Sequence, residues 1–243
     1  MSSEQHYLRG VIHCHSHYSF DSTTSISAYL RIAKRHELDF IILTDHDTIA
    51  GARALQAAAA ESMPNLQVPL AAEYLTDEGD VIAAFIEDEI QTRSFPQFVL
   101  AARRQNAALL LPHPYVGHRA PEQVAMECDL IEALNCRAGD SKNLAAARLA
   151  AALGKRAYAG SDAHFARSIT SAIVEVEGLG SLRSSILYGR MTWRSPRLAT
   201  RWEFGASQLI KSWKRRDPKL ALRMLQAGCS RILSTKRARE IAQ

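Results

Sequence analysis

A chain of 243 residues, 47% of them hydrophobic, is long enough for one large domain, or for a domain with an appendage, which excludes a mainly disordered protein. No apolar run reaches the roughly eighteen residues of a membrane span, and the start of the chain is polar rather than signal-like. We therefore expect a cytoplasmic protein without a transmembrane segment.

The early part of the chain alternates short apolar runs with helical patterns up to about residue 173. This alternation predicts βα units, arranged as a parallel sheet or a barrel. The expected strands are residues 10–15, 40–43, 68–73, 81–85, 109–111, 129–134 and 156–159. The expected helices begin near residue 26 and cover residues 50–60, 96–106 and 143–153.

Residues that commonly bind metals occur where these strands end. His13 and His15 are two residues apart, so a regular strand directs both imidazoles to one face. Because strand ends in a βα barrel converge on one rim, we expect the later residues of this type to meet the pair there. The candidate ligands are His13, His15, Asp21, His46, Glu73, His113, Asp162 and His164.

Mixed imidazole and carboxylate ligands suit zinc, manganese or iron better than magnesium or calcium. One metal takes three or four protein ligands, so this set favours a site with more than one ion, in which Glu73 or Asp162 bridges. Such a site activates water and stabilises the oxygens of a phosphoryl group. Cations after two strand ends are candidates to bind substrate: His118, Arg119, Arg137 and Lys142.

The C-terminal part has a different composition. Residues 183–243 hold fifteen Lys and Arg against three acidic residues, a balance of +12, whereas residues 1–182 carry −7. All three tryptophans lie there, and residues 220–233 suggest an amphipathic helix. We expect a domain at residues 1–180 and a basic helical extension at 181–243, which either lies against the acidic body or binds nucleic acid or an anionic membrane surface peripherally.

Several motifs, in order, resemble the PHP (polymerase and histidinol phosphatase) domain family. They are residues 13–16 with Ser19 and Asp21, residues 44–47, Glu73, residues 112–114 and residues 160–164, and the match covers residues 8–175. Residues 111–115 with Arg119, residues 132–137 and Asn143 are most similar to the stand-alone phosphoesterases of that family. The resemblance implies a distorted (β/α)7 TIM-like barrel, two or three divalent metal ions and phosphoesterase activity.

The resemblance also implies ligand sets. One metal would take His13, His15, Glu73 and Asp162, a second would share Glu73 and use His113, and a third would take Asp21, His46 and His164. Two positions depart from the family pattern: Val11 stands where members commonly have an aspartate, and Asp80 where many have a histidine ligand. Asp80 is retained as a candidate ligand, and His13, His15, Glu73, His113, Asp162 and His164 form the predicted catalytic set.

The sequence thus predicts a metal-dependent phosphoesterase, specifically a phosphatase of a small phosphorylated metabolite or nucleotide. A hydroxide held between metals is the expected nucleophile, with Arg119 and Arg137 stabilising the phosphoryl oxygens. Two alternatives stay open. One is a nuclease that acts on nucleic-acid ends through the basic extension, and the other is a non-catalytic binding module stabilised by metal.

Overall fold

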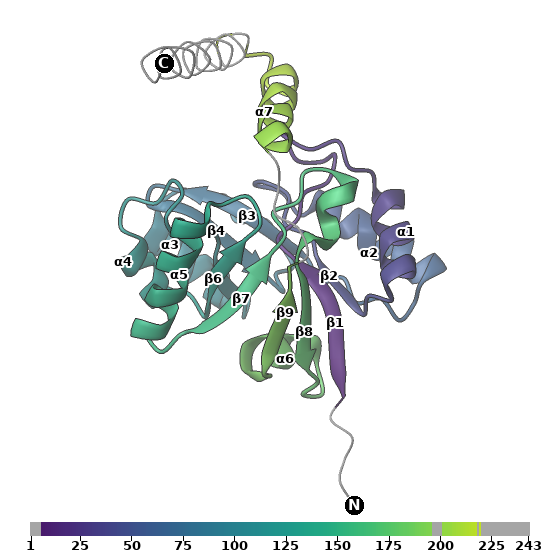
Figure 1. The fold of residues 1–243 in the computed structure, drawn as a ribbon, viewed down its shortest axis with the longest axis horizontal. Helices are drawn as coiled ribbons and strands as arrows, with labels where there is room; N and C mark the ends of the chain where they lie inside the picture. Colours follow the sequence, from purple (N-terminus) through teal and green to yellow (C-terminus); the bar gives the residue numbers. More distant parts are fainter. Residues whose placement is uncertain (1–5, 196–200, 218, 220–243) are drawn as a thin grey trace, which may run out of the picture.

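The strands form two separate sheets among residues 6–195, 201–217 and 219, which the computed structural model describes (Figure 1). The first sheet has the order β2 (Phe40–Ile42), β1 (Tyr7–Ile12), β8 (Ile173–Glu177) and β9 (Met191–Arg194). The second has the order β3 (Ala71–Thr76), β4 (Gly79–Ala84), β5 (Ala108–Leu111), β6 (Leu130–Asn135) and β7 (Arg156–Gly160).

The prediction of a (β/α)7 TIM-like barrel is wrong, because neither sheet closes on itself and the strands are not all parallel. β1 pairs with β2, β5 with β6 and β6 with β7 in parallel, but the other ladders are antiparallel. The β3–β4 connection explains part of the error. Only Asp77 and Glu78 separate these strands, and a parallel crossover needs about a dozen residues or more.

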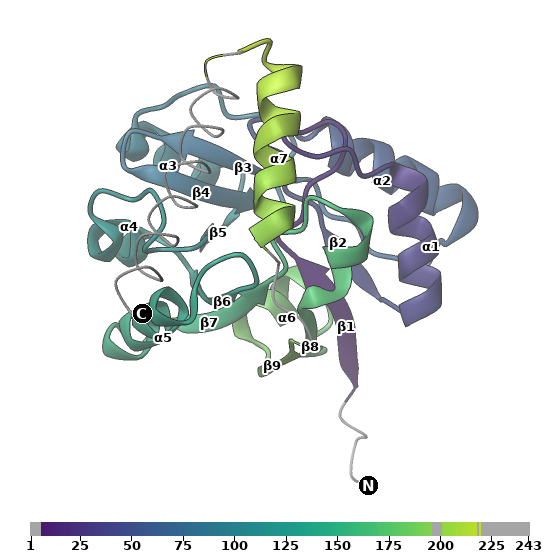
Figure 2. The same cartoon turned by 45° about the horizontal axis from the view of Figure 1, so that its top comes forward.

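Helices cover both outer sides of the paired sheets, as Figures 1 and 2 show. On one side lie α1 (Ile26–His36) and α2 (Ala50–Ser62), and on the other α3 (Phe95–Arg104), α4 (Pro121–Glu127) and α5 (Asp140–Ala152). Strand alternation produces the layers. Ile12 packs with Ile82 and Leu110 between the sheets, whereas the adjacent Val11 packs with Tyr29 of α1.

Irregular backbone at the strand ends places the candidate ligands. His13, His113 and Asp162 adopt positive φ angles of 61°, 28° and 45°, which residues other than glycine rarely do. Such conformations persist only where surrounding contacts enforce them, and they cluster at functional sites. Isolated bridges join the sheets at this end, one between Cys14 and Ala163 and one between His46 and Glu73. The strand ends are therefore drawn together locally without a closed barrel.

The C-terminal part remains in contact with the rest of the protein. A 3-10 segment (Ala166–Ser171), α6 (Leu182–Tyr188) and β9 follow β7, and β9 pairs with β8. The next helix, α7 (Arg201–Lys214), lies across the end of the molecule opposite α6, β8 and β9 (Figures 1 and 2). The expected helix at residues 220–233 lies outside the described residues, and the division at residue 180 stays a prediction. No helix in the described ranges is long and apolar enough to span a membrane.

Candidate metal centre

Four side chains surround one point at the ends of β1, β3 and β7. The relevant atoms are His13 Nε2, His15 Nε2, Glu73 Oε2 and Asp162 Oδ1. From Glu73 Oε2 to the two histidine nitrogens the distances are 3.4 Å each, and from Asp162 Oδ1 they are 3.7 and 3.5 Å. A tetrahedral metal with bonds of 2.0–2.2 Å separates its ligands by about 3.4 Å. The spacing therefore fits one shared cation.

Unpartnered buried atoms at the same point support this interpretation. His13 Nε2, both ring nitrogens of His15 and Glu73 Oε2 are buried, and none forms a hydrogen bond in the part of the chain that is described. Native proteins rarely leave buried polar atoms unpaired, because each costs about 1–3 kcal/mol. A divalent cation satisfies all of these atoms at once, so the residues present fit a bound metal.

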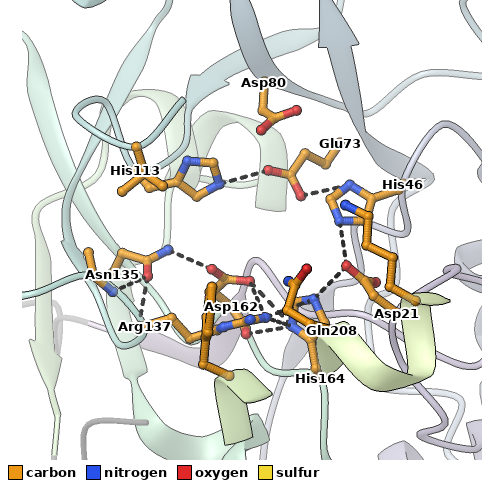
Figure 3. A pocket seen from close by; sticks show the side chains of 14 residues that line it. Asp21, His46, Glu73, Asp80, His113, Asn135, Arg137, Asp162, His164 and Gln208 are labelled. Carbon is orange, nitrogen blue, oxygen red and sulfur yellow. Dashed lines mark hydrogen bonds and ion pairs between the residues drawn. The ribbon is translucent and has the colours of Figure 1, made fainter. Parts of the chain in front are cut away.

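Glu73 is placed to bridge two ions. Its Oε2 faces His13 and His15, while its Oε1 lies 3.0 Å from His113 Nε2 (Figure 3). Atoms of Glu73, Asp80 and His113 come within 4.8 Å of one another and form a second candidate ligand set. Asp80 lies near the start of β4, on the strand paired with that of Glu73. An aspartate therefore occupies the position at which the resemblance led us to expect a histidine.

A third candidate set lies on the other side of Glu73. Asp21 Oδ2 is 3.2 Å from His46 Nε2 and 3.1 Å from His164 Nε2, and His46 Nδ1 is 3.3 Å from Glu73 Oε2 (Figure 3). The ring of His15 stacks at 4.6 Å on that of His46. All nine predicted metal-binding residues thus meet in one cluster of three adjoining sets.

The ionisation of this cluster suits cation binding. Burial raises the pKa of Glu73, but the charges of His13 and His46 outweigh it and hold that pKa well below its usual value. Burial lowers the pKa of His46 and His113, but nearby carboxylates, Glu73 first, raise both to about 9. Protons on these imidazoles thus balance the carboxylates, and a divalent cation replaces them on binding. Burial, followed by His164 and His46, lowers the pKa of His15 to about 3, so its nitrogens are free to ligate.

Glu132 on β6 supports the first ligand set and was not among the predicted site residues. Its fully buried carboxylate lies 2.8 Å from His13 Nδ1 and accepts hydrogen bonds from the backbone N–H of His113 at 2.6 Å and from Asn135 Nδ2 at 2.9 Å. A carboxylate on Nδ1 of a ligand histidine fixes the tautomer in which Nε2 binds metal. The available signal was an acidic residue inside an apolar strand, at residues 130–135.

A pocket of about 260 Å³ opens onto the cluster. Among its lining residues are six candidate ligands, Asn135 and Arg137 (Figure 3). Arg137 Nη2 donates to Ser207 at 2.9 Å, and its Nη1 lies 3.7 Å from Asp162 Oδ1. Of the four predicted substrate-binding residues, only Arg137 lines this pocket.

The other three predicted substrate-binding residues lie elsewhere. His118 Nε2 donates to the backbone oxygen of Asp80 at 2.7 Å, beside the second ligand set. Arg119 and Lys142 are exposed and do not line the pocket. Their places on the pocket wall are taken by α7, from which Phe204, Gln208 and Lys211 line it. The sequence gave no indication that this helix reaches the site.

The fold and this cluster together define an α/β protein with a buried candidate metal centre at its strand ends. A model of the PHP domain matches residues 12–117, and a model of the PHP-associated region matches residues 140–187. The chain belongs to the PHP family, as the motifs in its sequence predicted.

Individual relatives are distant. An uncharacterized protein of Methanocaldococcus jannaschii is 24% identical over 170 residues, which cover 62% of this chain and 96% of that protein. A two-domain protein of Bacteroides vulgatus, described as containing a predicted PHP-like metal-dependent phosphoesterase, superposes with a TM-score of 0.64 at 18% identity. The match covers 78% of this chain and 65% of that protein. PsfC of Pseudomonas syringae gives a TM-score of 0.60 at 15% identity, covering 86% and 98%. These structural similarities establish the fold.

Proposed function

We propose that the protein is a metal-dependent phosphoesterase, specifically a phosphatase of a small phosphorylated metabolite or nucleotide. The observation that carries the proposal is the set of buried, unpartnered nitrogens and carboxylate oxygens that face one small pocket with cations on its wall. Membership of the PHP family and similarity to a protein described as a PHP-like phosphoesterase support it. The pocket volume of about 260 Å³ favours a small substrate.

The residues divide the work by position. His13, His15, Glu73 and Asp162 would hold one ion, with further ions at the sets around Asp80 and Asp21. When bound, two or three ions of zinc, manganese or iron would supply an activated water and Lewis acidity. Glu132 would keep the Nδ1 proton of His13 in place.

Arg137 has a separate part in the proposed reaction. Its guanidinium lines the pocket beside Asp162, where it would bind the phosphoryl oxygens and orient them.

Phosphate release from a generic aryl phosphate tests the proposal, together with a screen of nucleotides, sugar phosphates and short oligonucleotides and element analysis of the purified protein. We expect His13→Ala and Asp162→Ala to abolish turnover and to lower the metal content. His6→Ala, at an exposed histidine, should change neither. Undiminished turnover in either site variant would refute the proposal. Turnover of oligonucleotides alone would favour the nuclease, and bound metal without turnover of any compound would favour the binding module.

A further inference from the structure

The inward face of α7 forms part of the pocket wall. Phe204, Gln208 and Lys211 are separated by four and three residues, so they share one face of the helix, and all three line the pocket. Trp202, Leu209 and Trp213 lie on the opposite face and are 63%, 52% and 74% exposed. This helix therefore turns polar and charged side chains towards the candidate metal centre and leaves apolar ones outside.

Specific contacts fix α7 in this position. Near its start, buried Glu203 accepts hydrogen bonds from Arg167 Nε at 2.9 Å and from Ser168 Oγ at 2.5 Å. Near its end, Lys214 Nζ donates to the backbone oxygens of His17, Ser19 and Ser22, each at 2.7 Å. The helix is held at both ends, so the side chains between them keep a defined place over the pocket.

Lys211 is the residue of this face with the most unused binding capacity. Its Nζ lies 4.8 Å from the centre of the Phe20 ring, which itself stacks on His46 at 4.6 Å. Within the described part of the chain, the partly buried Lys211 ammonium makes neither a hydrogen bond nor an ion pair. An ammonium group has three N–H donors, and removing it from water without partners is unfavourable. Arg137 differs, because Ser207 and Asp162 already contact its guanidinium.

We propose that Lys211 is a substrate-binding residue that donates hydrogen bonds to the phosphoryl oxygens of a small phosphorylated ligand, with the Gln208 amide beside it. The proposal rests on the proposed function, since it names a group that recognises the substrate of that same pocket. It makes α7, which lies outside both matched family regions, part of the substrate site.

Binding of inorganic phosphate to the zinc- or manganese-loaded full-length protein, measured by calorimetry, tests this role without requiring turnover. Charge-assisted hydrogen bonds predict that Lys211→Met weakens phosphate binding at least about 10-fold, with part of the affinity kept by Lys211→Arg. Lys219→Met removes the same charge at an exposed position and serves as the matched control. Its phosphate affinity should equal that of the wild type. Where a substrate is known, Lys211→Met should raise KM by a similar factor.

The outcomes separate this inference from the proposed function. Equal phosphate binding by the wild type and Lys211→Met, or an equal loss in Lys219→Met, would overturn the role of Lys211 even in an active phosphatase. Loss of metal from Lys211→Met would also overturn it, because the effect would then pass through Phe20 to His46. A specific loss of phosphate affinity in a protein that hydrolyses no phosphoester would uphold Lys211 as an anion-binding residue and refute the proposed function.

Discussion

Replacing Glu132 with glutamine should damage the metal centre while leaving the shape of the core almost unchanged. The carboxylate faces three donors: His13 Nδ1, the backbone N–H of His113 and the Asn135 amide. A glutamine has one acceptor oxygen, so its NH2 group must face at least one of these donors. If the NH2 faces His13, the imidazole proton moves to Nε2, which is the atom that faces the first ligand set.

The magnitudes follow from burial. Glu132 is fully buried, and an unsatisfied buried donor costs about 1–3 kcal/mol, so the free energy of unfolding should fall by that amount. Loss of a group that orients a ligand typically weakens metal affinity by roughly 10–100-fold. Chemical denaturation measures the first effect, and competition with a zinc chelator measures the second. Glu127→Gln on exposed α4 surface is the matched control and should change neither.

A second variant approaches the same carboxylate from the other side. Gly160 on β7 has no side chain, and a Cβ there would collide with Glu132 Oε1. Gly160→Ala should therefore push the carboxylate away from His13 and lower both stability and metal affinity. If Glu132→Gln and Gly160→Ala both bound the first metal as tightly as the wild type, the assigned role of Glu132 would be wrong.

Three further predictions concern other parts of the site. Burial, followed by Glu73, raises the pKa of Asp80 from 3.8 to about 6, so in metal-free protein this carboxyl favours folding below pH about 4 and loses that contribution as the pH rises through 6. Denaturation of chelated protein at both pH values should show Asp80→Asn gaining on the order of 3 kcal/mol over wild type by pH 7, and a constant difference would contradict this. Lys214→Met removes three hydrogen bonds to the loop that carries a ligand of the third set; element analysis should show a lower metal content, and an unchanged content would rule out this support. Gly51→Ala brings a Cβ against the Asp45 carboxylate and should lower the unfolding free energy by about 1–3 kcal/mol. Gly205→Ala, with open space at its Cβ, should be neutral or stabilising, and equal effects of the two would refute the collision.

The ligand residues could be predicted because their signal is local. Each candidate is a histidine or carboxylate near a strand end or an adjoining loop, and such groups meet at one edge whether the strands form a barrel or an open sheet. The pairing of strands is a non-local property. Only the short Asp77–Glu78 connection announces an antiparallel pair, and it was overlooked in favour of a continuous βα series.

Residues that act through other residues could not be found in the same way. Glu132 sits inside an apolar strand, and its partner His13 lies 119 positions earlier in the chain. The pattern of an apolar strand predicts burial, but it does not say which donor a buried carboxylate will meet. Only the register of β6 beside β7, together with the space left by Gly160, brings Glu132 to His13.

The charge of the C-terminal part shows most clearly where composition stops being informative. A balance of +12 against −7 suggests that the basic extension is attracted to an acidic body. The contacts of α7 do not follow that picture, because Lys214 binds backbone oxygens and acidic Glu203 of the helix meets Arg167 of the body. Exposed charges at such distances are screened by salt, whereas these buried contacts are not. Neutralising α7 one residue at a time should therefore produce effects that depend on position, large at Lys211 and Lys214 and small at Lys219, rather than effects proportional to net charge.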